Sequence, residues 1–297
     1  MASGCAPRTL TPDPARLAPW TVALRDAQPD EPRVAVYQYR GRPLVFVGAV
    51  HENDVESPTF RLIREVYDAF QFDTALVEGV PYASGPDPAG LFEYVDASEA
   101  EGSFQPGGET VPAVEGARRQ GATVWGGEPS DPDVLALAAG AGVTETDVLG
   151  YYVLRVLPQW LREGETERPT DPRTRDLVEA ELDAQRPRLG LGADTLPDVA
   201  AWTAWYAQTN GRPFGDGFAT EEVGPLSDGP HGTNRVAYSV SQARDRFLLG
   251  RIAAHLDRGE AVLVVYGSSH LTILRPALDA LLGPPCIAGA DLTAGDC

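Results

Sequence analysis

The sequence has 297 residues, of which 43% are hydrophobic and 23% charged, a composition typical of a folded protein large enough to bury a core. The net charge is −19 and every basic side chain is an arginine, so the surface repels phosphate backbones and nucleic-acid binding is excluded. The longest apolar candidate, residues 261–266, is far shorter than the roughly 18 residues of a membrane-spanning helix, so no transmembrane segment is predicted.

The first part of the chain predicts an arm followed by a hairpin. Residues 1–32 are rich in Pro, Ala and Asp without a clear period, which is typical of an arm or linker. Residues 33–40 alternate apolar and polar side chains, the period of a half-buried strand, and residues 43–50 are more continuously apolar. With a tight turn at Gly41 between them, the two segments predict a β-hairpin.

Helix and strand signals alternate after the hairpin. Ser57 followed by a proline is typical of a helix N-cap, and apolar side chains then recur at helical spacing up to Phe70. Residues 74–77 predict a short buried strand that ends at Glu78. The sequence continues with a loop-rich stretch over residues 81–112, a helix over 113–120 and a strand over 123–125.

The middle of the chain, about residues 130–235, is predicted to be mostly helical and to form an insertion or cap. Four candidate helices have Asp, Ser or Thr near their starts, and they cover residues 131–139, 144–160, 172–185 and 196–208. A Gly- and Pro-rich loop over residues 211–233 precedes a long helix over 236–258. A strand over 261–266 and a helix over 271–282 follow.

Strand–helix alternation at both ends predicts an α/β fold with a mixed sheet. The sheet is expected to have parallel core strands and an N-terminal β-hairpin, to be flanked by helices, and to carry the helical insertion or cap. The expected organisation is an arm over residues 1–32, a single domain over 33–283 and a C-terminal tail over 284–297.

The three cysteines lie near the ends of the chain. Cys286 and Cys297 enclose a short Gly- and Ala-rich tail and would close a disulfide loop in an oxidising compartment. Cys5 follows small residues of the kind found before the lipidated cysteine of bacterial lipoproteins, as in a chain that starts just after a removed signal peptide. These features favour an extracytoplasmic protein, periplasmic or anchored at the cell surface through Cys5. The alternative is a cytoplasmic protein with three free thiols.

Two strand ends carry the same motif, VGAVH ending at His51 and YGSSH ending at His270. In each, a buried strand is followed by glycine, two residues and histidine. Polar ligands in open α/β sheets lie beyond the carboxyl ends of the strands. We therefore expect both histidines to converge with Glu78 and Glu128, which end two other strands. The chain has only four histidines, and two of them share this setting.

Two imidazoles with one or two carboxylates are suitable ligands for a divalent ion such as Mn, Co, Zn or Fe. Such an ion lowers the pKa of bound water and generates a nucleophile. Without a metal, the same side chains could carry out general acid–base hydrolysis. Arg244 could clamp a carboxylate or stabilise developing negative charge, or it could form an ordinary salt bridge on a helix. Glu128 could equally be a solvated acid in a turn.

Several other site classes are excluded by pattern. The sequence contains neither a P-loop nor a Gly-x-Gly-x-x-Gly fingerprint between strand and helix, which argues against nucleotide binding. It also lacks the Gly-x-Ser-x-Gly elbow of serine hydrolases.

The ordered set VGAVH, ALVEG, GGEPSD, ARD and VYGSSHL resembles the TIKI/TraB superfamily, which is related to erythromycin esterases and ChaN-like haem-binding proteins. The resemblance extends as islands over residues 33–283 and implies a mixed sheet capped by helices. By resemblance, His51, Glu78, Arg244 and His270 take the family's site positions. This chain has Arg-Asp where many relatives have Arg-Asn, and it lacks glycines often found after the second histidine.

The leading hypothesis is a metal-dependent hydrolase of a peptide or amide bond. His51, Glu78 and His270 would hold the ion or position the water. Arg244 would stabilise the oxyanion, and Glu128 would be a second acid or ligand. The substrate would be a peptide or a small molecule. The alternatives are a metal-independent esterase, a non-catalytic scaffold, and a haem- or small-ligand-binding lipoprotein that uses an aromatic surface from residues 151–152 and 202–206.

Overall fold

The computed structural model describes residues 9–292. The chain divides into two compact units. The first contains the residues up to Ala18, Ala27–Pro129 and the residues from Asp245 onward, and the second contains Pro19–Asp26 and Ser130–Arg244. The boundary at Arg244 and Asp245 falls within one long helix, α10 (Gly232–Asp257).

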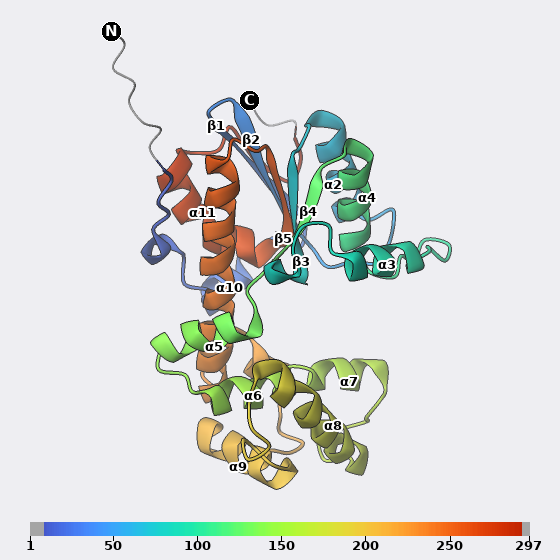
Figure 1. Cartoon of the computed structure of the whole chain (residues 1–297). Coiled ribbons are helices and arrows are strands. Elements are labelled where there is room, and N and C mark those ends of the chain that lie inside the picture. Colours follow the sequence, from blue (N-terminus) through green and yellow to red (C-terminus); the bar gives the residue numbers. More distant parts are fainter. Residues whose placement is uncertain (1–8, 293–297) are drawn as a thin grey trace. The chain divides into compact units, whose positions relative to one another are not determined.

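The first unit is built on a six-stranded mixed sheet with strand order β4-β3-β5-β2-β1-β6 (Figure 1). Strands β2, β5, β3 and β4 are parallel, whereas β1 pairs antiparallel with both β2 and β6. The predicted α/β class, with parallel core strands and an N-terminal hairpin, is therefore confirmed. The strands are β1 (Arg33–Tyr39), β2 (Arg42–Ala49), β3 (Thr74–Pro81), β4 (Thr123–Glu128), β5 (Val262–Gly267) and β6 (Ile287–Gly289).

The hairpin turn has the geometry that two-residue connections prefer. Arg40 and Gly41 both have positive φ, 50° and 75°, which matches the right-handed twist of the strands they join. Tyr39 pairs with Arg42 directly across the turn. The pairing register then runs down to Arg33 opposite Gly48, so the hairpin sets the position of the first histidine motif.

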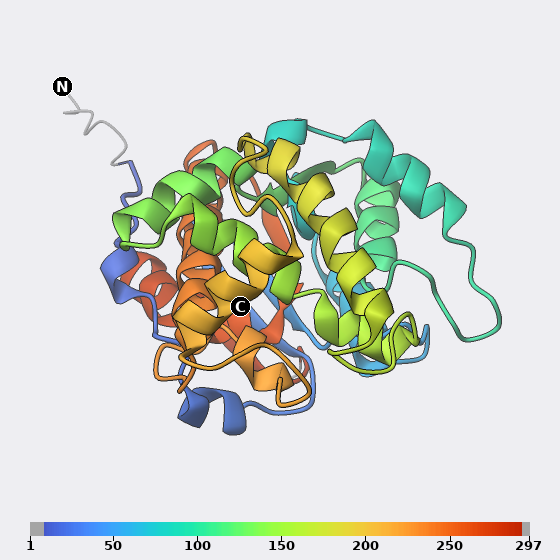
Figure 2. The same ribbon diagram turned by 90° about the horizontal axis from the view of Figure 1, so that it is seen from below.

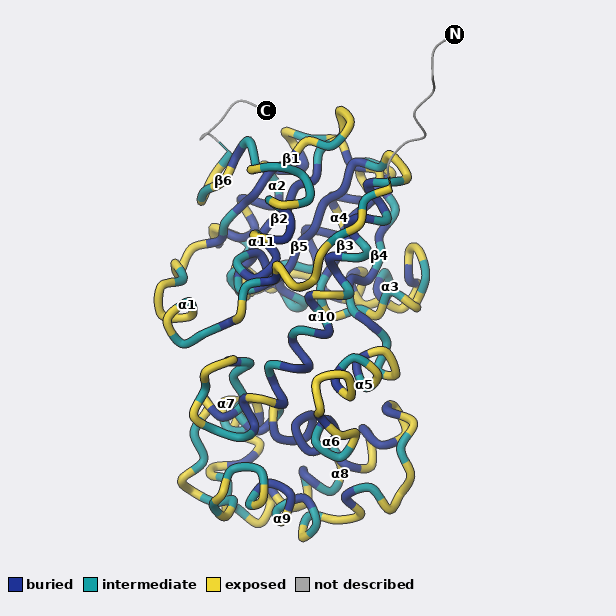
Figure 3. The backbone as a smooth tube through the Cα atoms, turned by 90° about the vertical axis from the view of Figure 1, so that its left-hand side faces the viewer, coloured by how far each residue is buried: buried dark blue, intermediate teal, exposed yellow. Residues whose placement is uncertain are grey.

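Helices flank the sheet on both faces. On one face, α2 (Pro58–Ala69) and α4 (Thr110–Gln120) pack with α3 (Ala89–Ala97), and on the other lies α11 (Ser268–Leu282). The predicted N-cap is confirmed, because the Ser57 hydroxyl accepts a hydrogen bond from the backbone N–H of Phe60 at the start of α2. The strands are the most deeply buried part of this unit (Figure 3). The core under α2 and α4 includes Val45, Val47, Ile63, Val66, Ala75, Val77, Val114 and Val265.

The second unit is helical and has its own core (Figure 2). Ser130 and Thr144 each form a capping box with an aspartate three residues later, as their positions before apolar segments predict. The large aromatic side chains of this unit, among them Trp202 and Tyr206, are buried in its core. Its elements are α1 (Val22–Asp26), α5 (Asp131–Gly140), α6 (Glu145–Leu154), α7 (Leu157–Glu163), α8 (Pro172–Leu189), α9 (Val199–Asn210), the 3-10 helix η3 (Thr220–Val223) and the first part of α10.

Three details of the predicted elements are wrong. The single helix expected over residues 144–160 is two helices, because Pro158 has no N–H to donate and its ring clashes with the carbonyl of Leu154, where α6 ends. Helix α3 lies within the stretch expected to be loop-rich, where flanking glycines and prolines conceal its short apolar pattern. The expected tail contains the edge strand β6.

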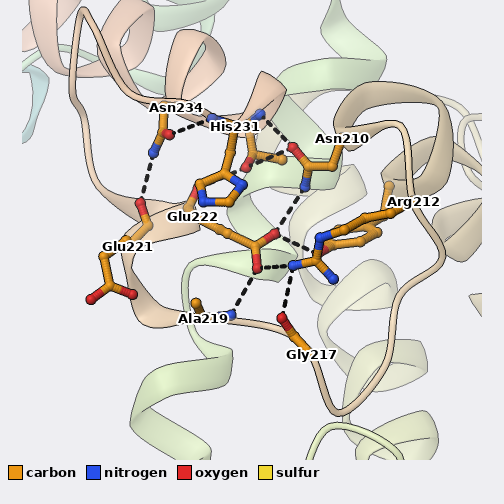
Figure 4. A network of polar contacts seen from close by, with 10 residues as sticks. Asn210, Arg212, Gly217, Ala219, Glu221, Glu222, His231 and Asn234 are labelled. Atoms are coloured by element: carbon orange, nitrogen blue, oxygen red, sulfur yellow. Dashed lines mark hydrogen bonds and ion pairs between the residues drawn. The ribbon is translucent and has the colours of Figure 1, made fainter.

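A buried carboxylate holds the loop between α9 and α10 in the second unit (Figure 4). Glu222 is fully buried and accepts hydrogen bonds from the backbone N–H of Ala219 at 2.7 Å and from the side-chain amide of Asn210 at 3.1 Å. The Tyr206 hydroxyl and the Arg212 guanidinium also donate to it. Because a buried charge without partners is costly, this network fixes the loop.

Within the described part of the chain, no helix combines the length and the apolar character needed to cross a membrane. Cys286 is disulfide-bonded. Its expected partner Cys297 and the candidate lipid anchor Cys5 lie outside the described residues, so that pairing and the anchor stay predictions.

Candidate active site at the carboxyl edge of the sheet

Three neighbouring parallel strands bring the first candidate residues together. Gly48 and Ala49 of β2 pair with Tyr266 and Gly267 of β5, and Val77 of β3 pairs with Val265 of β5. The chain therefore leaves β2, β3 and β5 at one edge of the sheet. His51 follows β2, Glu78 lies near the end of β3, and Gly267 ends β5, so the predicted convergence of these motifs is found.

Glu78 lies at the centre of this edge. Its Oε2 accepts a hydrogen bond from the backbone N–H of Gly267 at 2.7 Å. A methyl group added to Gly267 would lie 3.4 Å from the same Oε2 and 3.1 Å from Nε2 of His51. Both side chains therefore lie against the bare Cα of Gly267. Glycine at this position allows an imidazole and a carboxylate to approach the strand end together.

The second histidine reaches Glu78 from the first turn of α11. Nε2 of His270 is 3.6 Å from Oε1 of Glu78, and Nδ1 is 2.6 Å from Oδ1 of Asp245 on α10. The side chains of His270 and Asp245 are only 7% and 1% exposed. An ionised carboxylate can only accept, so Nδ1 of His270 carries a proton and donates it to Asp245. Nε2 is then the atom directed at Glu78.

The first histidine repeats this arrangement in a more open setting. Nδ1 of His51 is 2.6 Å from Oε1 of Glu109, which immediately precedes α4, and the His51 side chain is 65% exposed. The hydrogen bond with Glu109 raises the pKa of His51. Burial opposes this rise, the charges of Glu109 and Glu78 add to it, and His270 lowers the pKa. Each histidine thus has a carboxylate on Nδ1 and lies near Glu78.

The glycine of the first motif has a separate role in packing. A methyl group on Gly48 would lie 3.1 Å from the Cα of Ser268 and 3.2 Å from the Cβ of Leu271. A side chain here would push β2 and the first turn of α11 apart by a few tenths of an ångström, so glycine allows their close approach. Arg33, at the start of β1, fixes the same turn, since its guanidinium donates to the backbone oxygen and hydroxyl of Ser268, each at 3.1 Å. These contacts position the helix that carries His270.

Glu128 also lies at this edge, at the end of β4. Its Oε1 accepts a hydrogen bond from the backbone N–H of Gly79 at 3.3 Å. Gly79 has φ 83°, a backbone conformation that favours glycine, and it lies in the part of β3 where the pairing register with β4 shifts. Glu128 thereby supports the backbone that carries Glu78.

Arg244 is grouped with the second unit, one residue before Asp245 on α10. Within that unit it lies near two buried tyrosines. Burial raises the pKa of Tyr151 and Tyr152, and the positive charge of Arg244 partly offsets this rise. The role of Arg244 as an oxyanion group stays a prediction from the resemblance.

The remaining histidines have other surroundings. His255 is fully buried, with Nδ1 2.6 Å from Glu260 and Nε2 3.3 Å from the Tyr82 hydroxyl. Glu260 precedes β5, so this cluster lies at the opposite edge of the sheet. His231 lies just before α10 in the second unit, where its backbone N–H donates to Asn234 (Figure 4).

Two carboxylates of the site were not predicted. Asp245 belongs to the Arg-Asp pair that the sequence does single out, but only its arginine was assigned a role. Glu109 lies in a Gly- and Pro-rich stretch that carries no periodic or motif signal.

The aromatic segments considered for a haem-binding surface belong to the second unit. Residues 151–152 and the three aromatic side chains within 202–206 are buried in the core of the second unit and do not form an exposed surface.

Among the described residues, no group of three or more His, Cys, Asp or Glu side chains is arranged to hold a metal ion. The donor chemistry nonetheless fits a divalent ion. Two imidazole Nε2 atoms and one carboxylate are typical ligands, and metal-bound histidines usually donate their other ring N–H to a carboxylate. Asp245 and Glu109 stand in that position for His270 and His51.

Comparisons with protein-family models, with curated proteins and with solved structures find no match to this chain. The resemblance to the TIKI/TraB superfamily therefore rests on the ordered motifs and stays a prediction.

Proposed function

We propose that the chain is a hydrolase of peptide or amide bonds whose active centre consists of His51, Glu78 and His270. The observation that carries this proposal is the repeated arrangement around Glu78. Two imidazoles, from two different Gly-x-x-His motifs, lie beside one carboxylate, and each is held on Nδ1 by a further carboxylate. Structural histidines have no need of this duplication, whereas a centre that binds and activates water does.

The Nε2 atoms of His51 and His270 and the carboxylate of Glu78 would hold a divalent ion. When bound, the ion would lower the pKa of a water molecule and polarise the substrate carbonyl. Asp245 and Glu109 keep the protons on Nδ1, so that both Nε2 lone pairs remain available as ligands. A neutral imidazole is required for this, so the site is expected to bind the ion better as the pH rises through the histidine pKa values.

Hydrolysis requires that the water oxygen bond to the carbonyl carbon, that one water proton be removed, and that the leaving nitrogen gain a proton as the C–N bond breaks. Glu128 is the remaining carboxylate at the sheet edge that the sequence singles out, and it would take up the water proton and return it to the leaving nitrogen. Its hydrogen bond with the backbone N–H of Gly79 holds it close to the residue that follows Glu78. By the resemblance, Arg244 would stabilise the oxyanion.

A metal-independent esterase is the second candidate, and the buried pair of His270 and Asp245 favours it. A histidine whose Nδ1–H is held by a carboxylate is a suitable general base, because the carboxylate stabilises the imidazolium. In this form Nε2 of His270 accepts the water proton and later donates it to the leaving oxygen. Glu78 would orient the water. This form uses Glu78 and His270 of the same centre and requires no metal.

The test is a substrate screen with the purified full chain. Wild-type protein is incubated with a peptide library and with simple amides and esters, and products are identified by mass spectrometry. We expect cleavage to fall about 100-fold or more in His51→Ala, Glu78→Gln and His270→Ala, the scale of losing an acid–base group. The control Glu65→Gln alters an exposed side chain on α2 and should be fully active. Full activity in both histidine variants would refute the proposal.

A further inference from the structure

A pocket of about 550 Å³ opens beside Glu78 in the first unit. It lies between the end of β3, the first turns of α3 and the residues before α4. Its volume is in the range of about 300–1,000 Å³ that small-molecule sites have. Glu78 lines it, so the pocket and the proposed active centre share this carboxylate.

The walls of the pocket are mostly apolar. Val80, Pro88, Leu91 and Tyr94 contribute carbon surface, and polar groups come from a few hydroxyls. Tyr94 is 52% exposed, one of the two large hydrophobic side chains that the described residues leave open to solvent. An apolar wall that stays solvent-exposed beside a reactive centre is typical of a ligand site rather than of packing.

Glycines create the space. Gly90 lies one helical turn before Tyr94 on α3, and a methyl group there would meet no atom within 4 Å. At Gly107, by contrast, a methyl group would lie 3.1 Å from Cε1 of Tyr94. Gly107 therefore allows the tyrosine ring to approach the loop closely, and Gly90 leaves open space at the pocket wall.

The charge of the lining limits what can enter. Among the described residues that line it, Glu78 is the only carboxylate and there is no arginine or histidine. Glu109, next to the lining residue Thr110, adds a second negative charge close by. An anionic group would be repelled, whereas an uncharged apolar group could replace water on the walls at no electrostatic cost.

We propose that this pocket is a specificity subsite that binds an uncharged aromatic or branched aliphatic group of the substrate, next to the bond that is hydrolysed at Glu78. This inference rests on the proposed hydrolase function, because it uses the same centre. The structure assigns selectivity to Tyr94 and Gly90, which lie on one face of α3. It predicts a preference for neutral hydrophobic groups over small or acidic ones.

The experiment is a titration of the full chain with prodan, an uncharged naphthalene dye whose fluorescence shifts to the blue in apolar surroundings. Gly90→Leu would fill the pocket without backbone strain, because the position is helical. The matched control is Gly140→Leu, at an exposed end of α5 where a methyl group also meets nothing. We expect binding to wild type and to Gly140→Leu, and at least about tenfold weaker binding to Gly90→Leu, the equivalent of losing contact with about two methylene groups.

Three outcomes would overturn the inference. They are no binding to wild type, equal binding to Gly90→Leu, and tighter binding of the anionic dye anilinonaphthalene sulfonate than of prodan in a Gly90-dependent manner. The last outcome is tested because the start of α3 also lines the pocket and helix N-termini favour anions. Tyr94→Ala provides a second variant that removes a wall instead of filling the space, and it should weaken prodan binding as well.

The subsite inference and the proposed hydrolase function can be tested separately. His270→Ala lies outside the lining and should bind prodan as wild type does, although it loses hydrolysis. Prodan binding that depends on Gly90, together with no cleavage of any substrate by wild type, would support the pocket and refute the hydrolase. If cleavage is found, the ratio of kcat/KM for a phenylacetyl amide over an acetyl amide should fall about tenfold in Gly90→Leu. An unchanged ratio would overturn the subsite and leave the function intact.

Discussion

The carboxylate of Asp245 lies 2.6 Å from Nδ1 of His270, and both side chains are buried. This pair joins α10, whose first residues belong to the second unit, to the first turn of α11, the helix that follows β5. It fixes the proton of His270 on Nδ1 and directs Nε2 at Glu78, 3.6 Å away. The chemistry of the site therefore depends on Asp245, which acts through its hydrogen bond with His270.

Asp245→Asn tests this link. An amide at this position keeps the size of the side chain but removes the charge, and it can also donate to Nδ1 and so move the proton to Nε2. We expect a loss of about 10- to 100-fold in activity or in metal affinity, the usual cost of losing a partner behind a ligand histidine. The control is Asp279→Asn on α11, which changes a carboxylate that accepts hydrogen bonds from Tyr37 and Arg275. Equal activity in the two variants would contradict the assignment.

Glu109→Gln tests the corresponding pair at His51. The hydrogen bond from His51 to Glu109 raises the pKa of His51 above its ordinary value, so removing the negative charge should lower it. The proton NMR titration of His51 in metal-free protein measures this directly. Because a raised pKa keeps the imidazole protonated to higher pH, activity that needs neutral His51 should extend to lower pH in Glu109→Gln. The exposed Glu115→Gln on α4 should leave both the titration and the pH profile unchanged.

Gly267→Ala tests whether the glycine of the second motif serves the site or the fold. Its φ of −51° is open to alanine, so the backbone is not strained. The added methyl group would lie 3.1 Å from Nε2 of His51, which must move away. The imidazole has to shift by a few tenths of an ångström. Since a misplacement of about 1 Å can cost about 100-fold in rate, we expect a loss of up to about tenfold with little change in thermal stability. Gly250→Ala on α10, where a methyl group meets no atom within 4 Å, is the control.

The cluster at the opposite edge of the sheet predicts how the fold responds to acid. Burial opposes ionisation of Glu260, but hydrogen bonds from Arg258, Thr74 and His255 outweigh it and lower its pKa from 4.5 to about 2. Between these two pKa values, Glu260 therefore binds a proton more readily in the unfolded chain than in the folded one. The stability from Glu260 is fully present above pH 4.5 and is lost as the pH falls towards 2.

Urea unfolding of Glu260→Gln measures this contribution. We expect a loss of about 1–2 kcal/mol at pH 7, because solvent screens part of the interaction of this incompletely buried carboxylate, and a flatter dependence of the unfolding free energy on pH between about 4.5 and 2. The exposed Glu65→Gln should follow the wild-type curve. If Glu260→Gln showed the same acid dependence as wild type, another group would be responsible for it.

The sequence predicts the sheet and half of the site for the same physical reason. His51, Glu78, Glu128 and Gly267 each follow or end a strand, and parallel strands place their carboxyl ends at one edge. Periodicity and caps likewise predict α2, α5 and α8, because Ser, Thr or Asp before an apolar period is a local signal.

The partners of the histidines depend on information that no local pattern carries. Glu109 reaches His51 from a loop between two helices, and Asp245 reaches His270 from α10, 25 positions earlier in the chain. No spacing rule connects residues this far apart. The break before Pro158 is different, because the rule against prolines inside helices is local and would have divided the single helix predicted over residues 144–160.

The most direct measurement of the central claim is the metal content of protein purified without chelators or affinity metals. It is determined by elemental analysis for wild type and for the His51→Ala/His270→Ala double variant. We expect close to one Mn, Co, Zn or Fe ion per chain in wild type and none in the double variant. A metal retained in the double variant, or a wild-type protein that takes up none of these ions after soaking, would contradict it.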